Sequence, residues 1–243
     1  MNFIKNLFKK SEGTLSTNGF LSADTPDANS LTEYKVSLDK TVVNLTKSTG
    51  VSFDTLKSRV NLVLDYSGSM RDLYFNGTVQ RVITKILPLA LKFDDNGVLD
   101  CFLFSNGYNS IGGCTEKNYL DYVKNVVKPS SRPMGGTNYA PILDHIHNND
   151  SQTIPTFTIF ITDGDNADPA MTDDVIRQSS LDNGFIMFVG IGNADFRYLR
   201  KLDTLSDRPV DNTGFVEFKD IRKVDETTLY EKLLSEYSAW LKH

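Results

Sequence analysis

The sequence predicts a doubly wound α/β fold, in which a mostly parallel β-sheet carries helices on both of its faces. Two observations lead to this fold class. From residue 60 onward, short apolar runs alternate with segments whose apolar residues recur at helical spacing. Polar residues also follow two of the apolar runs, at the edge where sheets of this kind bind ligands.

Each apolar run is expected to form one strand. The main strands are predicted at residues 60–65, 98–105, 156–162, 185–191 and 214–218. A short antiparallel edge strand is expected near residues 108–112.

Helices are predicted between these strands. Apolar residues at helical spacing place one helix over residues 79–90. A second helix has Pro141 in its first turn, where the missing N–H costs little, and Thr172 is expected to cap a third. A shorter helix over residues 196–202 precedes a last one, which Asp225 caps.

The chain is expected to divide into three parts. Residues 1–33 are interpreted as a flexible N-terminal segment, because much of this stretch is rich in Ser, Thr, Gly, Asp and Asn. Residues 34–57 are expected to form a short arm, with strands where apolar residues alternate at 34–38 and 41–45. Residues 58–243 form the predicted main domain.

Composition and charge limit the classes of function. The formal net charge of −5 argues against nucleic acid as the main partner. No apolar run approaches the ~20 residues that span a bilayer. The first ten residues lack the features of a secretion signal, so a cytoplasmic location is expected, and membrane contact by this N-terminus is not expected. Cys101 and Cys114 show no metal or redox spacing and are interpreted as a buried thiol and a loop thiol.

Three separate segments carry the residues of a candidate site. Asp65, Ser67 and Ser69 follow the first strand, Thr137 follows a Gly-Gly pair before a helix, and Asp163 ends the third main strand. If these two strands are neighbours, all five oxygen-bearing side chains meet at the point where the strand order reverses. Each segment alone would be weak, because Ser, Thr and Asp are common in turns and helix caps.

With these residues in view, the sequence resembles the von Willebrand factor A family with a metal-ion-dependent adhesion site. The family pattern is Asp-x-Ser-x-Ser, then Thr, then Asp, and all five positions match. The resemblance covers about residues 60–243 and is strongest to tellurite-resistance TerF-type A domains, with copine A domains more distant. The runs that carry it are LALKFDDNG at 89–97, GTNYAPIL at 136–143, TDGDNAD at 162–168 and GIGNADF at 190–196. Residues 34–47 resemble the opening strands of TerD-type domains.

The resemblance implies a metal-bridged binding module rather than an enzyme. It implies that Ser67 and Ser69 bind the metal directly and Thr137 directly or through water, while Asp65 and Asp163 act largely through bridging waters. Such oxygen ligands suit Mg²⁺, with Mn²⁺ or Ca²⁺ as alternatives. The implied partner is a protein that supplies a carboxylate to the metal, with a TerD-type protein as one candidate, in a bacterial or phage tellurite or stress-resistance system.

Two alternatives compete with this interpretation. In the first, the serines only cap a helix and Asp163 only starts a turn. In the second, the chain is a Mg²⁺-dependent phosphohydrolase, but Ser67 stands where such enzymes place a second Asp.

Other polar residues near these segments are given lesser roles. His145 and His147 are two residues apart, so on a helix they point in different directions and are interpreted as solvated surface residues. Asp165 and Asp168 are interpreted as supporting or turn residues.

Overall fold

One six-stranded sheet forms the centre of the computed structural model, which describes residues 26–242 except 54–55, 131–132, 150–152 and 165. The strands are β1 (Arg59–Asp65), β2 (Asp100–Phe104), β3 (Tyr108–Ser110), β4 (Thr156–Thr162), β5 (Gly184–Ile191) and β6 (Thr213–Phe218). Their order is β3-β2-β1-β4-β5-β6, and all neighbours are parallel except β2 and β3. The predicted fold class is therefore confirmed, including the antiparallel edge strand.

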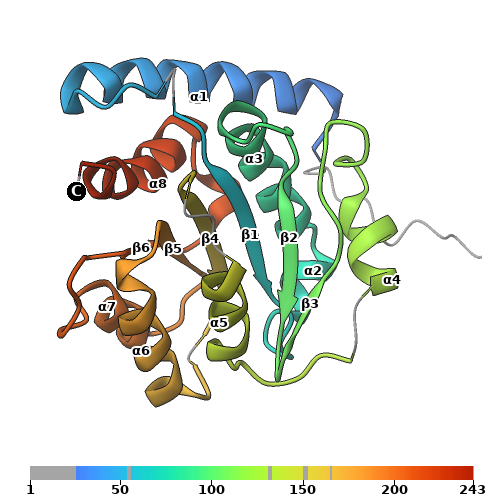
Figure 1. Ribbon diagram of the computed structural model, residues 1–243. Coiled ribbons are helices and arrows are strands. Elements are labelled where there is room, and N and C mark those ends of the chain that lie inside the picture. The colour runs from blue at the N-terminus through green and yellow to red at the C-terminus, as the bar shows by residue number, and fades with distance from the viewer. Residues whose placement is uncertain (1–25, 54–55, 131–132, 150–152, 165, 243) are drawn as a thin grey trace, which may run out of the picture.

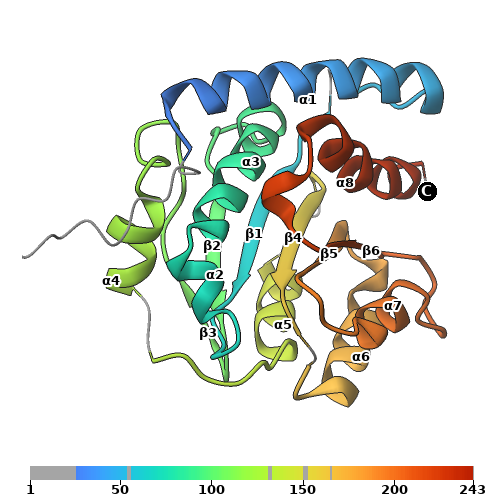
Figure 2. The same cartoon turned by 180° about the vertical axis from the view of Figure 1, so that it is seen from behind.

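Helices cover both faces of this sheet (Figures 1 and 2). One hydrophobic core joins the sheet to α3 and α8, and a second joins its other face to α5, α6 and α7. The helical segments are α1 (Ala28–Thr49), α2 (Arg71–Phe75), α3 (Thr78–Phe93), the π-helical η1 (Val123–Val127), α4 (Lys128–Ser130), α5 (Ala140–Asn149), α6 (Pro169–Gln178), η2 (Ser179–Leu181), α7 (Arg197–Asp203), η3 (Ile221–Lys223) and α8 (Glu226–Trp240).

Strand β1 shows why the apolar runs predicted the sheet. Leu62 and Leu64 belong to the core under α3 and α8, while Val63 belongs to the opposite core, and all three are fully buried. A strand covered on both faces is apolar at nearly every position, as parallel strands usually are. The run ends at Asp65, where the chain leaves the sheet between β2 and β4.

The predicted strands of the N-terminal arm are wrong. Residues 28–49 form α1, a single helix that crosses α3 and α8 at one end of the sheet (Figure 1). Its buried apolar residues are Leu31, Tyr34, Leu38 and Val42, which recur every three or four positions. The same residues also contain short alternating runs of apolar and polar residues, and this alternation predicts strands where the longer helical period is the correct signal. The likeness of residues 34–47 to TerD opening strands fails for the same reason.

Both ends of α1 are capped by neighbouring residues. The Asp27 carboxylate accepts hydrogen bonds from the backbone N–H groups of Asn29 and Ser30, at 3.0 and 2.9 Å, and the Ser30 hydroxyl oxygen accepts from Asp27 N–H at 3.2 Å. This is a reciprocal capping box. At the other end Gly50 takes a left-handed conformation with φ of 76°, and its N–H donates to the Thr46 carbonyl.

Two further cap predictions have opposite outcomes. Asp225 caps α8 as expected, because its carboxylate accepts from Thr228 N–H at 2.9 Å. Thr172 does not cap α6, which begins earlier, at Pro169, and places Thr172 inside the helix. Proline is well suited to that first helical position, since its φ is already fixed near the helical value.

The predicted flexible segment lies mostly outside the described residues, which begin at 26, and residues 28–33 are part of α1. In the part of the chain that the structure describes, no helix is long and apolar enough to cross a membrane.

Candidate metal site

The site begins with Asp65 at the carboxyl end of β1. Its side chain is fully buried and is held by two hydrogen bonds. One carboxylate oxygen accepts from Ser67 N–H at 2.7 Å, and the other accepts from the Thr162 hydroxyl at 2.7 Å. Because Thr162 ends β4, the Asp65 carboxylate ties together the carboxyl ends of the two strands at which the sheet order reverses.

Three more of the predicted residues meet beside this carboxylate. The hydroxyl oxygens of Ser67 and Ser69 lie 3.0 Å apart, and the Ser69 hydroxyl donates to the Asp163 carboxylate at 2.8 Å. Ser67 is buried, Ser69 is exposed, and Asp163 is intermediate between them. The cluster therefore runs from the interior of the sheet edge out to solvent, where a ligand can approach.

The loop that carries Thr137 lies against this cluster through its backbone. Ser67 pairs with Gly135 in an isolated parallel bridge, and Gly68 N–H donates to the Gly135 carbonyl at 3.2 Å. On the other side, Ala167 N–H donates to the Thr137 carbonyl at 2.8 Å. Thr137 thus stands between the loops that follow β1 and β4, and the structure brings all five predicted residues to one edge of the sheet.

The two carboxylates are in an environment that favours a cation. Burial raises the pKa of Asp65 to about 6, although hydrogen bonds from Thr162 and Ser67 oppose the change. Burial also raises the pKa of Asp163, against the hydrogen bond from Ser69. A raised carboxylate pKa means that the ionised form lacks part of the stabilisation that water would give. A nearby divalent cation would restore it.

The donor set fits a hard cation. Ser67, Ser69, Thr137, Asp65 and Asp163 offer only hydroxyl and carboxylate oxygens, which suit Mg²⁺, Mn²⁺ or Ca²⁺ and not a soft metal. Among the described residues, no cluster of three or more His, Cys, Asp or Glu side chains could hold a metal instead.

Asp168 is a supporting residue of the site, as the sequence predicted, and the structure shows which contacts give it that role. Its carboxylate accepts from the backbone N–H groups of Tyr139 and Ala140, at 2.8 and 3.2 Å, and from the Thr172 hydroxyl at 3.0 Å. It therefore caps α5 from a different segment of the chain and fixes the backbone just after Thr137. Asp165 lies outside the described residues.

We expect Asp168→Ala to weaken Mg²⁺ binding by about 10- to 100-fold, the range seen when a supporting residue of a metal ligand is removed. The loss follows because two backbone donors at the start of α5 lose their acceptor, and the loop that carries Thr137 loses its anchor. Isothermal titration with Mg²⁺ measures this, with Asp174→Ala on the exposed face of α6 as the control. Equal affinities for the two variants would contradict the role of Asp168.

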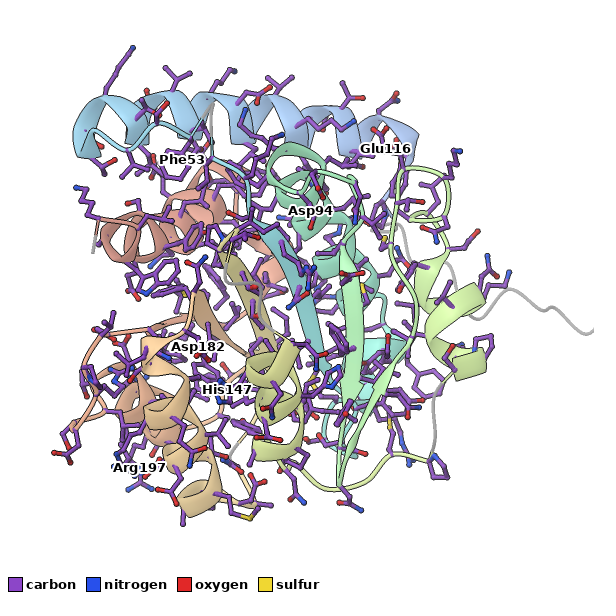
Figure 3. All side chains as sticks on the ribbon, viewed as in Figure 1. Phe53, Asp94, Glu116, His147, Asp182 and Arg197 are labelled. Atoms are coloured by element: carbon purple, nitrogen blue, oxygen red, sulfur yellow. The ribbon has the colours of Figure 1, made fainter. Side chains whose placement is uncertain are left out.

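His145, His147 and the two cysteines are not among the residues that meet at the site. His147 is only partly solvated, since its ring nitrogen Nδ1 contacts the Asp182 carboxylate, and the two side chains face each other in Figure 3. His145 stacks on the ring of Tyr108, with centroids 4.6 Å apart. Cys101 is buried as expected, but the predicted loop thiol Cys114 is buried too, because its segment pairs with Leu99 beside β2.

A family model described as "vWA-TerF-like: vWA found in TerF C terminus" matches residues 57–243, about three quarters of the chain. The chain belongs to this von Willebrand factor A family. The predicted resemblance is therefore confirmed at the level of the family. A curated relative, "Uncharacterized protein YcbR" of Bacillus subtilis (strain 168), is 38% identical over 191 residues, which cover 76% of this chain and 78% of the relative.

Solved structures agree on the fold of this A domain. A von Willebrand factor type A protein from Catenulispora acidiphila is 19% identical, with a TM-score of 0.52 over 76% of this chain and 42% of that one. Proximal thread matrix protein 1 from the mussel byssus, in a form with a zinc-occupied MIDAS motif, is 14% identical, with a TM-score of 0.53 over 74% of this chain and 48% of its own. Manganese-loaded TRAP protein of Plasmodium vivax is 16% identical, with a TM-score of 0.51 over 75% and 73%. This chain spans less than half the length of the first two.

Proposed function

We propose that this A domain is a binding module that holds a divalent cation, Mg²⁺ first, and through it the carboxylate of a protein partner. The observation that carries the proposal is the cluster of Ser67, Ser69 and Asp163 above the buried Asp65, at the point where the sheet order reverses. Bound there, the cation would supply an open coordination position to an acidic group. The neutral hydroxyls leave most of its positive charge available for that group.

The five residues of the site have different roles in this binding. Ser67, Ser69 and Thr137 would hold the cation with their hydroxyl oxygens. Asp65 holds the Ser67 backbone in place and takes a hydrogen bond from Thr162, so it orients the hydroxyls rather than facing the partner. Asp163 holds the Ser69 hydroxyl and contributes negative charge at the solvent side.

Two further observations support a metal-dependent interface. The byssus protein is described with a zinc-occupied MIDAS motif, and the TRAP protein is described as manganese-loaded. In this chain, segments that follow the strands of the same edge expose large apolar side chains: Phe75 at 57%, Tyr108 at 39% and Met171 at 63%. Exposed apolar residues around a polar centre are typical of a protein-binding surface.

The name of the family model supports a proposal for the physiological setting. The TerF link favours a tellurite or stress-resistance system of a bacterium or phage, a TerD-type partner and a cytoplasmic location. Turnover of a substrate is not part of the proposal. Hydrolysis of generic phosphate esters that requires Mg²⁺ and disappears in Asp65→Ala would favour the phosphohydrolase alternative instead.

Thr137→Ala is expected to weaken Mg²⁺ binding and partner binding together, by about tenfold or more, while the melting temperature in chelator stays near that of the parent. Metal and partner each strengthen the other's binding by the same factor, so loss of a metal ligand must weaken the binding of both. Capture of partners on the immobilised chain, with Mg²⁺ and with excess chelator, measures the effect.

Thr227→Ala, an exposed threonine of α8, is the matched control for this test. Partner capture that is equal with Mg²⁺ and chelator, for the parent and both variants, would place the binding surface elsewhere and contradict the proposed function.

A further inference from the structure

A pocket of about 240 Å³ lies beside the metal site, at the ends of β2 and β3. We call it the side pocket. Its walls include Tyr66, Leu103, Asn106, Tyr108 and Asn109. Its volume is below the ~300 to 1,000 Å³ of pockets that bind drug-sized ligands. The side pocket therefore has room for one large side chain rather than for a cofactor or a metabolite.

Hydrogen bonds join the side pocket to the metal site. Tyr66, in its wall, stands between Asp65 and Ser67 in the chain, and Tyr66 N–H donates to the Phe104 carbonyl at 2.8 Å. Asn106, also in its wall, accepts from Gly136 N–H at 2.8 Å, one residue before Thr137. The wall of the pocket and the loop that carries Thr137 thus form one connected unit.

The contact between Asn106 and the Gly-Gly pair is close. A Cβ atom at Gly136 would lie 2.7 Å from the Asn106 amide oxygen, and one at Gly135 would lie 3.1 Å from the amide nitrogen. A side chain at Gly136 would displace the Asn106 amide from this loop. A group that enters the side pocket and contacts Asn106 would therefore also affect the position of Thr137.

The chemistry of the walls selects the occupant. No described residue that lines the side pocket is charged, and the lining includes two tyrosines, Tyr66 and Tyr108, and two asparagines, Asn106 and Asn109. A Lys or Arg side chain would find no carboxylate there and would lie next to a divalent cation, so its charge would be unpaired. An aromatic side chain, in contrast, gains ring contacts and can direct a polar tip to an amide.

We propose that the side pocket receives an aromatic side chain from the same partner segment whose carboxylate binds the metal. This inference rests on the proposed function and names its partner more narrowly, as a segment with an acidic and an aromatic residue at a fixed spacing. Aromatic anchors in pockets, surrounded by weaker contacts, carry much of the affinity of many protein interfaces.

A displayed library of random peptides is the probe. It is selected on the immobilised full chain in Mg²⁺ and eluted with chelator. We expect the eluted peptides to share an acidic residue and an aromatic residue at constant spacing. Alanine at the aromatic position should weaken binding of a selected peptide by about tenfold or more. Selection on Tyr108→Ala should enrich the acidic residue without the aromatic one.

A double-mutant cycle then places the ring. If the peptide's aromatic residue occupies the side pocket, its replacement by alanine has little further effect on the Tyr108→Ala chain, so the two losses are not additive. Leu181→Ala removes an exposed apolar side chain from η2, which precedes the start of β5, and should leave the aromatic preference intact. Melting temperature and Mg²⁺ affinity of both variants, compared with the parent, separate loss of the pocket from loss of the fold.

The outcomes distinguish this inference from the proposed function. Two results would contradict the aromatic occupant of the side pocket and still support metal-bridged binding. The first is a set of chelator-eluted peptides that share an acidic but no aromatic residue, and the second is additive losses of affinity in the cycle. Selection with no chelator-sensitive peptides overturns the proposed function, and the occupant of the side pocket with it.

Discussion

Asp65→Asn is expected to stabilise the metal-free protein at neutral pH, by up to ~3 kcal/mol, while it removes the stabilisation that Mg²⁺ gives. The Asp65 carboxylate is fully buried, and burial raises its pKa from 3.8 to about 6. Ionisation of Asp65 therefore destabilises the folded state. An amide keeps the size and can still accept from Ser67 N–H, while its NH₂ group can donate to the Thr162 hydroxyl oxygen.

Whether stability rises or falls with pH depends on which state, folded or unfolded, binds more protons. Between pH 4 and pH 6 the folded state holds a proton on Asp65 that the unfolded state has lost. Stability of the metal-free parent should therefore fall as pH rises through this window, and the Asp65 contribution should be constant above it. Urea unfolding in chelator, at several pH values, measures the slope. For Asp65→Asn this part of the slope should be absent.

Asp72→Asn, an exposed carboxylate of α2, is the matched control and should unfold like the parent under all conditions. Addition of Mg²⁺ should raise the midpoint of the parent and of this control, but not that of Asp65→Asn. A metal-free Asp65→Asn that is less stable than the parent at pH 7 would show that hydrogen bonds satisfy the buried carboxylate without a cation.

Sequence predicted the parts of this molecule whose signals are local and repeated. The strand β4 is a continuous buried run of strand length, and the helix α3 repeats its apolar residues at helical spacing, so a local signal identifies each of them. The candidate site could also be predicted, because Asp65 and Asp163 follow two apolar runs, and strand ends of a parallel sheet meet at one edge.

What the sequence could not predict depends on contacts between distant segments. Asp168 caps α5 although it follows the start of that helix by many residues, so no local pattern marks it. The partnership of Asn106 with Gly136 likewise depends on how two loops pack. In α1, short alternating runs were mistaken for strands because the helical stripe becomes clear only when Leu31, Tyr34 and Leu38 are considered together.

Helix α1 raises the question of where the folding unit begins, because the family model starts at residue 57 and α1 precedes it. Leu38 is 1% exposed in the contact of α1 with the main domain, and Tyr34 beside it accepts a hydrogen bond from Arg81 of α3 at 3.3 Å. Asp39 pairs with Lys92 of α3 at 2.9 Å. These contacts join α1 to the core that it covers, so α1 and the main domain should unfold together.

Leu38→Ala is accordingly expected to lower the free energy of unfolding of the whole domain by about 2 to 5 kcal/mol, as large-to-small changes in a packed core do. Trp240 of α8 is the single tryptophan of the chain and contacts Phe185 of β5, so its fluorescence reports the packing of α8 on the sheet of the main domain. Val36→Ala, which is 48% exposed on the same helix, should change the free energy of unfolding by less than ~0.5 kcal/mol. If Leu38→Ala leaves the Trp240 transition unchanged, α1 is an appendage that detaches alone, and the main domain folds from residue 58 without it.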